Sequence, residues 1–550
     1  MTKQTRVLFF VTHPQSSNGY SLVGYELAKV LSKRPDINLT IFGFQNFSTH
    51  NGATPIANHR HDFPSNVSVY DAFANENPKQ AGFGVSLVKD FVATNRPDVV
   101  IVYNDMLVLT SVIGQLKEVP NRKFKIIAYI DQVYMCQKKE FINFVNQNAD
   151  VALLFTPYWE QCIKEQGITL PMKNLRHGFN PETHYPIPKH LARKFYGLKA
   201  QDFIILNLNR NQPRKRWDIC LQAFADVVKA FPDEPIKLLV ATAVQGAWNL
   251  LEIFERELQK RGLALADGMK HLILLDNPQQ LSDEDVNFLY NVADIGLNTC
   301  DGEGFGLCNF QQAAIGIPQI VPNIGGFRDF FNKDNSILIE PTMTYYVDNS
   351  RDMVCGEAQL CDYKDFAQAI ITYYQNRQLM ESHGKSSRTH IVTEYPWEKF
   401  GDELYHIIMD ATKDLAPIVE DEEAEQVVEK VNDDEEININ SLQEMVQAVD
   451  EGNAVPLHEV EVEVVDIPSP DVEEVIKMVK SVKSKTKKAE KEEKAEKAAK
   501  SAKAAKEKLR EKIKGKAGMA GKSGKTADIE TIETLRNKLD QLMTEKPVSA

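Results

Sequence analysis

The stretch IGLNTCDGEGFGLCNFQQAAIGIPQIVP, residues 295–322, has the pattern of a strand, a loop, a helix and a second strand. Short apolar, β-branched runs lie at its two ends, and a glycine-rich loop and a segment of helical period connect them. Units of this kind build parallel sheets that are covered by helices. The stretch therefore predicts an α/β fold.

The same alternation continues from residue 1 to about 412 and separates into two series of predicted strands. The first series is VLFFV, LTIFGF, VVIVY, KIIAYI and VALLF, with helices such as 22–31 and 141–148 between them; the second is FIILNLN, IKLLVAT, HLILLD, IGLNT, PQIVP and SILIE. Between the series, NPETHYPIPKHLARK at 180–194 contains three prolines, which makes a helix or strand there unfavourable and predicts a linker near 178–190.

This pattern predicts two doubly wound, Rossmann-like domains, residues 1–186 and 187–394, that face a cleft. Ligands of such sheets bind outside the carboxyl ends of the strands, so we expect the site between the two domains. A helix at 395–416 is expected to pack back on the core.

Length and composition indicate a water-soluble protein of several domains. The chain has 550 residues, more than one hydrophobic core usually organises, with 43% hydrophobic residues and a mean hydropathy of -0.34. Residues 7–11 form the only apolar run near the start, and no segment approaches the roughly 18 apolar residues of a membrane-spanning helix. The seven cysteines form no CxxC pair, which favours reduced thiols in the cytoplasm over a zinc site.

The chain after residue 416 differs sharply in charge from the rest. Residues 417–475 hold 20 acidic side chains and one basic one, which predicts a disordered segment. Residues 476–526 are rich in Lys and Ala, with 19 basic and 6 acidic side chains, and residues 527–545 have the spacing of a short amphipathic helix. We expect the basic segment either to bind an anionic membrane surface or another polyanion, or only to keep the chain in solution. The net charge of -13 argues against nucleic acid as the main partner.

A basic loop follows the predicted strand FIILNLN and precedes a helix that starts near Asp218. Arg210 offers a planar fork of donors for a phosphate, and Lys215 offers a compact charge. The amino end of the following helix adds its dipole. The loop is either an anion site or an ordinary solvated basic loop, and the segment alone favours the second.

The two segments together resemble the carboxyl-terminal domain of the retaining glycosyltransferases of family 4, also called glycosyl transferases group 1, which have the GT-B fold. The residues that match the family's glutamate hallmark are Glu303, Gly304, Phe305, Gly306 and Leu307. The residues that match its basic motif are Arg210, Lys215 and Asp218. Weaker matches are Gly316 with Pro318, Gly325–Gly326, 395–398, Asn18–Gly19, 96–98 and 177–180, so that the resemblance covers about residues 5–412.

The resemblance implies transfer of a sugar, with retention, from a nucleoside diphosphate sugar to a hydroxyl of a glycan, lipid or protein acceptor. Glu303 would bind donor hydroxyls and stabilise charge near the anomeric carbon, while Arg210 and Lys215 would neutralise the leaving diphosphate in place of a metal. The backbone of 304–307, which includes Phe305 and Leu307, would orient the donor, because Gly304 and Gly306 allow close approach. Gly19 would close over the phosphates from the other domain. No cofactor is implied.

The chain departs from the family at two positions. Gln311 stands where the family has a glutamate that holds the nucleotide ribose, and an amide loses the charge-assisted hydrogen bond. Asp131 follows the predicted strand KIIAYI where relatives have a histidine over the donor sugar; it is either a sugar contact or a helix-cap or turn residue. His13, at another strand end, is a further candidate for this contact.

Gln311 also supports a second hypothesis, a catalytically weakened protein that binds a nucleotide sugar or a glycan and recruits partners through its charged tail. A third is an epimerase of the same fold. Asp283 and Asp285 have the spacing of a metal-binding pair, but acids at the start of a helix are explained by its dipole, and no metal site is predicted. The chain has no GxSxG elbow, Walker loop or dinucleotide fingerprint with its acidic partner.

Overall fold

The computed structural model describes residues 4–46, 60, 63–76, 82–276, 278, 281–348, 351 and 354–415. All of them belong to the first of the two units into which the chain divides, Met1–Pro456. The predictions for 417–475, 476–526 and 527–545 lie outside the described residues. Within the described part of the chain, no helix combines the length and the apolar character needed to cross a membrane.

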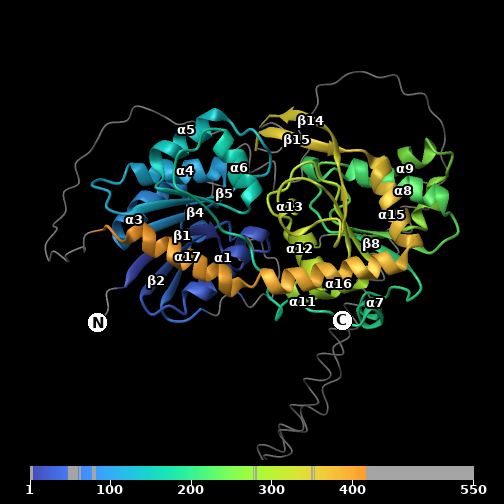
Figure 1. The fold of residues 1–550 in the computed structure, drawn as a ribbon, viewed down its shortest axis with the longest axis horizontal. Coiled ribbons are helices and arrows are strands. Elements are labelled where there is room, and N and C mark those ends of the chain that lie inside the picture. The colour runs from blue at the N-terminus through green and yellow to red at the C-terminus, as the bar shows by residue number, and fades with distance from the viewer. Residues whose placement is uncertain are drawn as a thin grey trace, which may run out of the picture. The chain divides into compact units, whose positions relative to one another are not determined.

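The first half of the chain forms a parallel sheet of seven strands in the order β3-β2-β1-β4-β5-β6-β7 (Figure 1). The strands are β1 Thr5–Thr12, β2 Ile37–Phe44, β3 Val67–Asp71, β4 Val99–Asp105, β5 Lys125–Asp131, β6 Val151–Leu154 and β7 Met172–Asn174. All five predicted strands are confirmed. Strands β3 and β7 escaped prediction because they lie at the two edges of the sheet and carry half-buried or exposed side chains in place of an apolar run.

Helices and helical turns connect these strands. They are α1 Gly19–Leu31, α2 Ala72–Asn75, η3 Val85–Leu87, α3 Val88–Asn95, α4 Met106–Lys117, α5 Lys139–Asn148 and α6 Pro157–Glu165. Helix α1 begins with a capping box, in which the Asn18 side chain accepts from the Ser21 N–H and the Ser21 side chain accepts from the Asn18 N–H. This cap fixes where the chain turns after β1.

The second half forms a parallel sheet of six strands in the order β10-β9-β8-β11-β12-β13. The strands are β8 Phe203–Asn207, β9 Ile236–Ala241, β10 Leu272–Leu275, β11 Ile295–Leu297, β12 Gln319–Pro322 and β13 Ile337–Ile339, and all six were predicted. Its helices are α7 Lys189–Phe195, η4 Pro213–Lys215, α8 Trp217–Ala230, α9 Leu250–Gln259, α10 Leu265–Met269, α11 Asp283–Val292, α12 Leu307–Ala314, α13 Phe327–Phe330, α15 Tyr363–Gln375 and α16 Arg377–Glu394. Two Rossmann-like parallel sheets confirm the predicted fold class.

The connection between the sheets differs from the predicted linker in one respect. Residues 180–194 were expected to contain no helix, yet α7 begins at Lys189, directly after Pro188. Proline is compatible with the start of a helix, because a backbone N–H at that position has no partner within the helix. The absence of the N–H therefore costs no hydrogen bond. Only the part before Pro188 is therefore irregular, and the boundary at residues 186 and 187 stays a prediction.

The chain returns to the first half through α17, Trp397–Thr412, which packs against α1 (Figure 1). The Phe179 N–H donates to the Tyr395 carbonyl at 2.7 Å, and a β-carbon on Gly178 would lie 2.6 Å from the Trp397 ring. Residues 177–180 and 395–398, two separate segments that carry the family resemblance, thus meet where the chain crosses back. The boundary expected at 394 and 395 stays a prediction.

A two-stranded antiparallel hairpin, β14 Pro341–Val347 and β15 Gly356–Cys361, was not predicted. It follows β13 and is not part of either parallel sheet. Strand β15 also forms a bridge with Met135 of the first half. The exposed side chains of β14 interrupt its apolar pattern, and for this reason the strand was not predicted.

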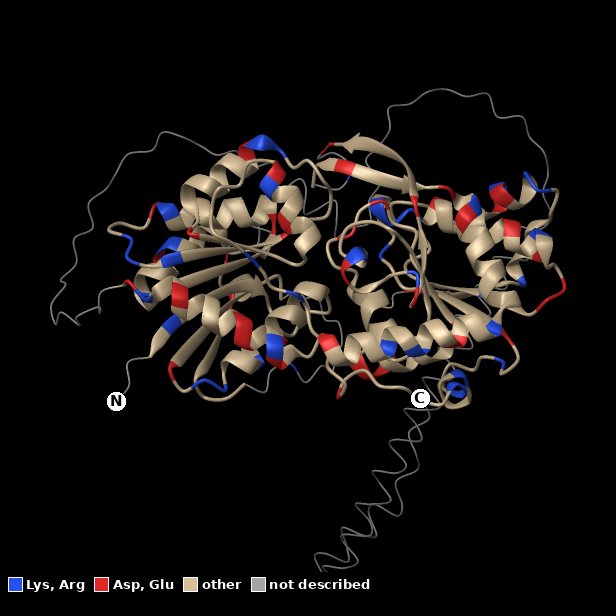
Figure 2. Ribbon diagram, in the orientation of Figure 1, with Lys and Arg blue, Asp and Glu red and all other residues tan. Residues whose placement is uncertain are grey.

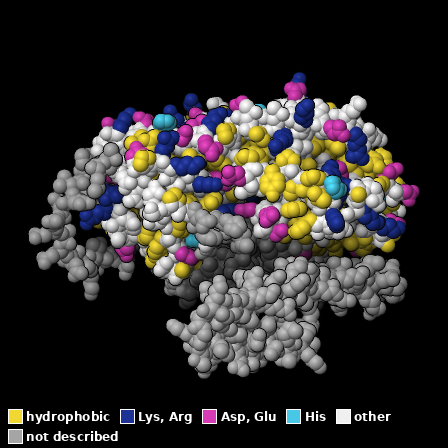
Figure 3. Space-filling model, turned by 90° about the horizontal axis from the view of Figure 1, so that it is seen from below, with side chains coloured by type: hydrophobic (Ala, Val, Ile, Leu, Met, Phe, Trp, Pro, Cys, Tyr) yellow, Lys and Arg dark blue, Asp and Glu magenta, His cyan; other side chains and the backbone are white. Residues whose placement is uncertain are grey.

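Charged side chains lie on helices and loops, while the strands of the two large sheets carry few of them (Figure 2). Over the described surface in Figure 3, charges of both signs alternate with apolar side chains. The two sheets are buried by apolar residues on both faces, as is typical of doubly wound folds.

Candidate functional site

Lys215 and Glu303 meet at the carboxyl ends of two neighbouring strands. Lys215 ends the turn that follows β8, and Glu303 lies in the loop that follows β11. Because β8 and β11 pair in parallel, their loops leave the sheet side by side. The Lys215 ammonium donates a hydrogen bond to Oε2 of Glu303, and both residues are 8% exposed. The structure thus joins two of the predicted site residues in a buried ion pair.

Arg214 is a second positive neighbour of Glu303 and was not singled out from the sequence. Its guanidinium lies 3.7 Å from Oε1 of Glu303 and donates to the Gly302 carbonyl at 3.2 Å. Burial alone would raise the pKa of the Glu303 carboxyl, but the charges of Lys215 and Arg214 outweigh it, so that the net pKa is lowered. Glu303 is therefore an anion at neutral pH. The adjacency of Arg214 to Lys215 was the available sequence signal.

Arg210 differs from these two bases because its side chain is exposed. Surrounding protein nevertheless displaces water from it, and this desolvation, followed by repulsion from Arg214, lowers the pKa of the guanidinium. An arginine stays protonated under these conditions. Arg210 thus presents a positive charge that is flanked by protein yet accessible from solvent, a suitable position for binding an anion.

Gly306 and Leu307 begin helix α12. Gly306 occupies its N-cap position with φ 92°, in the left-handed region that glycine adopts at no steric cost, and no side chain caps the helix. The first N–H groups of α12 lack partners within the helix and carry its positive dipole end. The predicted Gly304–Leu307 backbone therefore offers donors beside Glu303.

The side chain of Phe305 has a different role from its backbone. It is 3% exposed and packs against the rings of His177, Phe310 and Phe330, with centroid distances of 4.5 to 5.0 Å. This packing holds the loop between its two glycines. Phe305 can contribute its backbone to a ligand, while its side chain belongs to the core.

Asp131, the last residue of β5, approaches the Glu303 loop from the first half. Its Oδ2 accepts a hydrogen bond from the Tyr20 hydroxyl at 2.6 Å, whereas Oδ1 is buried and has no hydrogen-bond partner among the described residues. A β-carbon built on Gly304 would lie 2.1 Å from that Oδ1. Helix α5, the next along the chain, has Lys138 at its N-cap, so Asp131 does not cap this helix.

The pKa of the Asp131 carboxyl is raised to about 6. Desolvation is the largest cause; the hydrogen bond from Tyr20 and the charge of Arg214 act against it, and the charges of Asp105 and Glu303 add to it. Asp131 and Glu303 are thus two carboxyl groups with pKa values shifted in opposite directions. An ionisable group with a raised pKa and one unpartnered oxygen is suited to contact a polar ligand.

Two further predicted residues lie in different surroundings. Gly19 is the first residue of α1, and a β-carbon there would lie 3.1 Å from Cδ1 of Leu307, so the two predicted donor-binding positions are neighbours. His13 packs instead against Gly43 of β2, and its Nδ1 accepts from the Gln15 N–H at 3.3 Å. Burial lowers the pKa of His13, with the charge of Asp71 opposing the shift. Its contacts lie on the β2 and β3 side of the sheet, and its role as a sugar contact stays a prediction.

Gln311 lies on α12 and is 8% exposed. Its Oε1 accepts a hydrogen bond from the Tyr290 hydroxyl at 3.1 Å. A carboxylate would accept the same bond, so the Tyr290 contact is compatible with both the residue present and the family's glutamate. The amide nitrogen of Gln311 remains a donor that a glutamate lacks.

A chain of buried amides beneath the site was not foreseen. Asn298, just after β11, donates to Oδ1 of Asn309 at 2.9 Å and to Oδ1 of Asn209 at 3.4 Å, and its own Oδ1 accepts from the Cys300 N–H at 2.9 Å. Asn309 donates onward to Gln319, which donates to Gln312. These residues look like ordinary polar positions of strands and helices in the sequence, because only the fold brings them together.

Asp283 and Asp285 have structural partners at the start of α11. The Arg60 guanidinium donates to Oδ2 of Asp283 at 3.0 Å, and the Ser282 hydroxyl donates to Asp285 at 2.9 Å. Ser282 also caps the helix through the Asp285 N–H. The described residues contain no group of three or more His, Cys, Asp or Glu side chains arranged to hold a metal ion.

Comparison with known proteins adds a family to this geometry. Residues 189–389 match the family model described as glycosyl transferases group 1. A D-inositol 3-phosphate glycosyltransferase of Thermobispora bispora is 30% identical over 154 residues, which are 28% of this chain and 34% of that protein. The chain thus spans about a third of the length of the first curated relatives it matches.

Solved structures share the fold over most of the described chain. Sucrose-phosphate synthase from Thermosynechococcus elongatus aligns with a TM-score of 0.56 and 17% identity over 74% of this chain and 100% of that one. Anabaena Alr3699/HepE, solved in complex with UDP and glucose, aligns with a TM-score of 0.55 and 15% identity over the same shares, 74% and 100%. Residues 189–389 thus match the glycosyl transferases group 1 family, and the two Rossmann-like sheets have the GT-B fold.

Proposed function

We propose that this protein transfers a sugar from a nucleoside diphosphate sugar to an acceptor hydroxyl. The observation that supports this most directly is the cluster of buried Lys215 and Glu303 with half-buried Arg214, beside the uncapped start of α12. Positive charges and backbone donors suit a diphosphate, and a carboxylate next to them suits the hydroxyls of the attached sugar.

In the proposed reaction, the bond between the anomeric carbon and the diphosphate oxygen breaks, and its electron pair stays on the diphosphate. The acceptor oxygen forms the new bond to the anomeric carbon, and its proton passes to the departing diphosphate. Arg210 and Lys215 stabilise the charge that develops on the leaving group, while Glu303 stabilises the positive charge on the sugar. Retention of configuration and independence from metal ions are part of the proposal, because the family resemblance implies them.

The nucleotide itself is assigned to the α12 side of the site. Gln311 would bind the ribose hydroxyls through its amide, with its orientation held by Tyr290. The Anabaena protein with UDP and glucose makes uridine the first nucleotide to test. Asp131 would accept a hydrogen bond from a sugar hydroxyl with its unpartnered Oδ1, in the position where relatives have histidine.

The experiment is incubation of the purified full-length protein with UDP-glucose, UDP-GlcNAc, GDP-mannose and ADP-glucose. We expect slow release of nucleoside diphosphate from at least one donor by hydrolysis, and faster release once an acceptor is present. A repeat with excess EDTA tests independence from metal ions. Lys215→Ala should abolish the release, whereas Lys364→Ala, on the exposed face of α15, should leave it unchanged.

The outcomes separate the hypotheses. Nucleotide binding by calorimetry without any turnover across donors and acceptors would favour the catalytically weakened binding protein. Conversion of the donor sugar without release of nucleoside diphosphate would identify an epimerase. Absence of both binding and turnover would overturn the proposed site. Cytoplasmic localisation remains a proposal. Binding of the basic segment 476–526 to anionic surfaces also remains a proposal, and this segment lies outside the described residues.

A further inference from the structure

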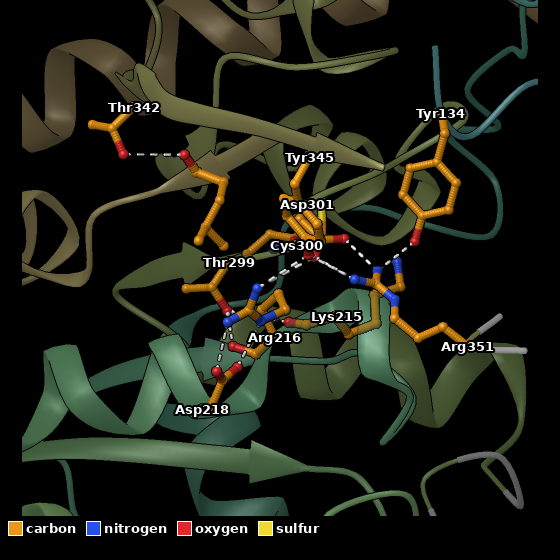
Figure 4. Close-up of polar contacts among 12 residues, drawn as sticks. Tyr134, Lys215, Arg216, Asp218, Thr299, Cys300, Asp301, Thr342, Tyr345 and Arg351 are labelled. Carbon is orange, nitrogen blue, oxygen red and sulfur yellow. Dashed lines mark hydrogen bonds and ion pairs between the residues drawn. The ribbon is translucent and has the colours of Figure 1, made fainter. Parts of the chain in front are cut away.

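A polar cluster around Asp301 lies beside the proposed site and is not used by the reaction described above (Figure 4). The Asp301 side chain is fully buried. It accepts hydrogen bonds from the Tyr345 hydroxyl, from Arg351 at 2.8 and 3.1 Å and from Arg216 at 3.4 Å. Asp301 precedes Glu303 by two residues, so whatever fixes Asp301 also fixes the loop that carries Glu303.

Arg351 extends this cluster into the first half of the chain. It lies between the two strands of the hairpin β14–β15, and its second guanidinium nitrogen donates to the Tyr134 hydroxyl at 2.6 Å. Its guanidinium is also 5.7 Å from the ring centres of both Tyr134 and Tyr345. Figure 4 shows it between Tyr134 on one side and Asp301 with Tyr345 on the other. Tyr134 follows Asp131 by three residues.

Backbone contacts reinforce the same junction. The Glu357 N–H donates to the Met135 carbonyl at 2.7 Å, and the Met135 N–H donates to the Glu357 carbonyl at 3.3 Å. The Gln137 side chain donates to the Cys355 carbonyl at 2.9 Å, and the Gln359 N–H donates to the Asp301 carbonyl at 2.9 Å. Strand β15 is thus bonded both to the segment after Asp131 and to the loop before Glu303.

Two glycines permit this approach. Gly356 has φ 143°, and a β-carbon there would lie 2.3 Å from the Met135 carbonyl oxygen. A β-carbon on Gly302 would lie 2.2 Å from the Tyr134 ring. The hairpin, the 133–137 segment and the Glu303 loop are therefore in direct contact, and the contact tolerates no added side chain at either glycine.

We propose that Arg351 and the hairpin β14–β15 form a clasp that holds Asp131 and Glu303 at a fixed separation. Arg351 is a positioning residue: it binds Asp301 on the Glu303 loop and Tyr134 on the Asp131 segment, and touches neither carboxylate that faces the donor. A guanidinium suits this function because its planar fork can bind two partners at once. The inference rests on the proposed function only for its kinetic consequence; the mechanical link itself is testable without any substrate.

The first experiment is amide hydrogen exchange on the full-length protein. In Arg351→Met, we expect exchange at 133–137 and 355–359 to rise by at least about tenfold, because the junction opens locally more often. Exchange in β8 and β9 should stay as in the wild type. Arg377→Met is the matched control, since Arg377 also lies over two aromatic rings, those of Phe203 and Tyr374, but bridges nothing across the junction. Wild-type exchange at both segments in Arg351→Met would overturn the clasp.

The second experiment separates positioning from general destabilisation. With UDP-glucose as donor, or the donor that the panel identifies, Arg351→Met should lower kcat by about tenfold or more, because small displacements of reacting groups are costly. The affinity for the nucleoside diphosphate alone should change less than about twofold, because all of its proposed ligands except Gly19 lie in the second half. A lysine reaches only one partner, so Arg351→Lys should recover part of kcat.

Tyr134→Phe removes only the hydroxyl that accepts from Arg351 and keeps the ring. We expect a smaller fall in kcat than in Arg351→Met, and the double variant should be no worse than Arg351→Met alone, since both changes break one link. Additive losses, or an equal fall in nucleotide affinity, would overturn the positioning role. If the exchange result holds while no donor is turned over by the wild type, the proposed function fails and the clasp stands.

Discussion

Oδ1 of Asp131 lies against Gly304 so closely that a β-carbon at position 304 would be 2.1 Å from it. The contact joins β5 of the first sheet to the loop after β11 of the second. We predict that Gly304→Ala displaces the Glu303 loop from Asp131 and lowers kcat by about 100-fold, as expected for a misplacement of about 1 Å. Steady-state kinetics test this; Gly114→Ala, at a glycine of α4 that has open space around it and no positive φ, controls for the added methyl group. Undiminished kcat would mean that the two residues are not used together.

Replacement of Glu303 by glutamine should lower kcat by at least about tenfold, because it removes charge directed at the transition state. The substitution also leaves the buried Lys215 ammonium without its anionic partner, so we expect a loss of about 1–3 kcal/mol in the free energy of unfolding. Kinetics at saturating donor and thermal unfolding measure the two effects separately. Full turnover in a folded variant would contradict the role of Glu303.

Arg210 and Lys215 should respond differently to alanine. Arg210 is exposed, so Arg210→Ala should weaken binding of the nucleoside diphosphate by about tenfold with little change in thermal stability. Lys215→Ala should impair binding and also lower the melting temperature, because buried Glu303 then loses its hydrogen-bonded cation and keeps only the more distant charges of Arg214 and Arg210. Calorimetric titration and differential scanning calorimetry provide the two readings. Equal melting temperatures for both variants would show that the Lys215–Glu303 pair adds nothing to stability.

Gln311→Glu restores the residue of the family, and we predict tighter binding of the nucleotide by about tenfold. The carboxylate can accept from Tyr290 with one oxygen and from a ribose hydroxyl with the other. Isothermal titration with UDP and with the donor found in the panel measures the change. Unchanged or weaker binding in Gln311→Glu would mean that the pocket is adapted to the amide.

The raised pKa of Asp131, about 6, predicts a pH dependence of activity. If the ionised carboxylate accepts from a sugar hydroxyl, kcat/KM of the wild type rises with pH through about 6, and Asp131→Asn lacks this limb. A pH profile that is the same in both proteins would assign the limb to another group.

Asp131 also predicts a pH dependence of stability. A carboxyl whose pKa is higher in the folded state than in the unfolded state, about 3.9, favours folding below pH 4 and loses this contribution as pH rises to about 6. Asp131→Asn should therefore be more stable than the wild type at pH 7, by about 3 kcal/mol at most, and the difference should vanish near pH 4. Chemical unfolding at both pH values measures it.

The sequence predicted those parts of the structure in which one local signal suffices. Apolar runs identified eleven strands of the two sheets, and the spacing around Glu303 and Lys215 identified two residues that prove to be paired. The hairpin β14–β15 was not predicted, because most side chains of β14 are exposed and show no apolar run. Strand β15 is also bridged to Met135, a distant contact that the local sequence does not reveal. Asp131 was ambiguous for the same reason: whether it caps a helix or faces the opposite half is decided by tertiary packing.

The amide chain below the site has a direction, and a single backbone group sets it. Because the Cys300 N–H can only donate, Asn298 must present its oxygen there and its amino group to Asn209 and Asn309. Each neighbouring amide must then accept with its oxygen on the side of Asn298 and donate with its nitrogen on the far side. One branch runs through Asn209 to Asn207, whose amide donates to the Cys220 sulfur at 3.4 Å. The other ends at Gln312, whose amide donates to the Tyr290 carbonyl at 3.3 Å. None of these amides titrates, so the polarity of the row is independent of pH. The peptide group two positions before Gly302 thereby serves as the reference that orients side chains on β8, α12 and β12 of the second half.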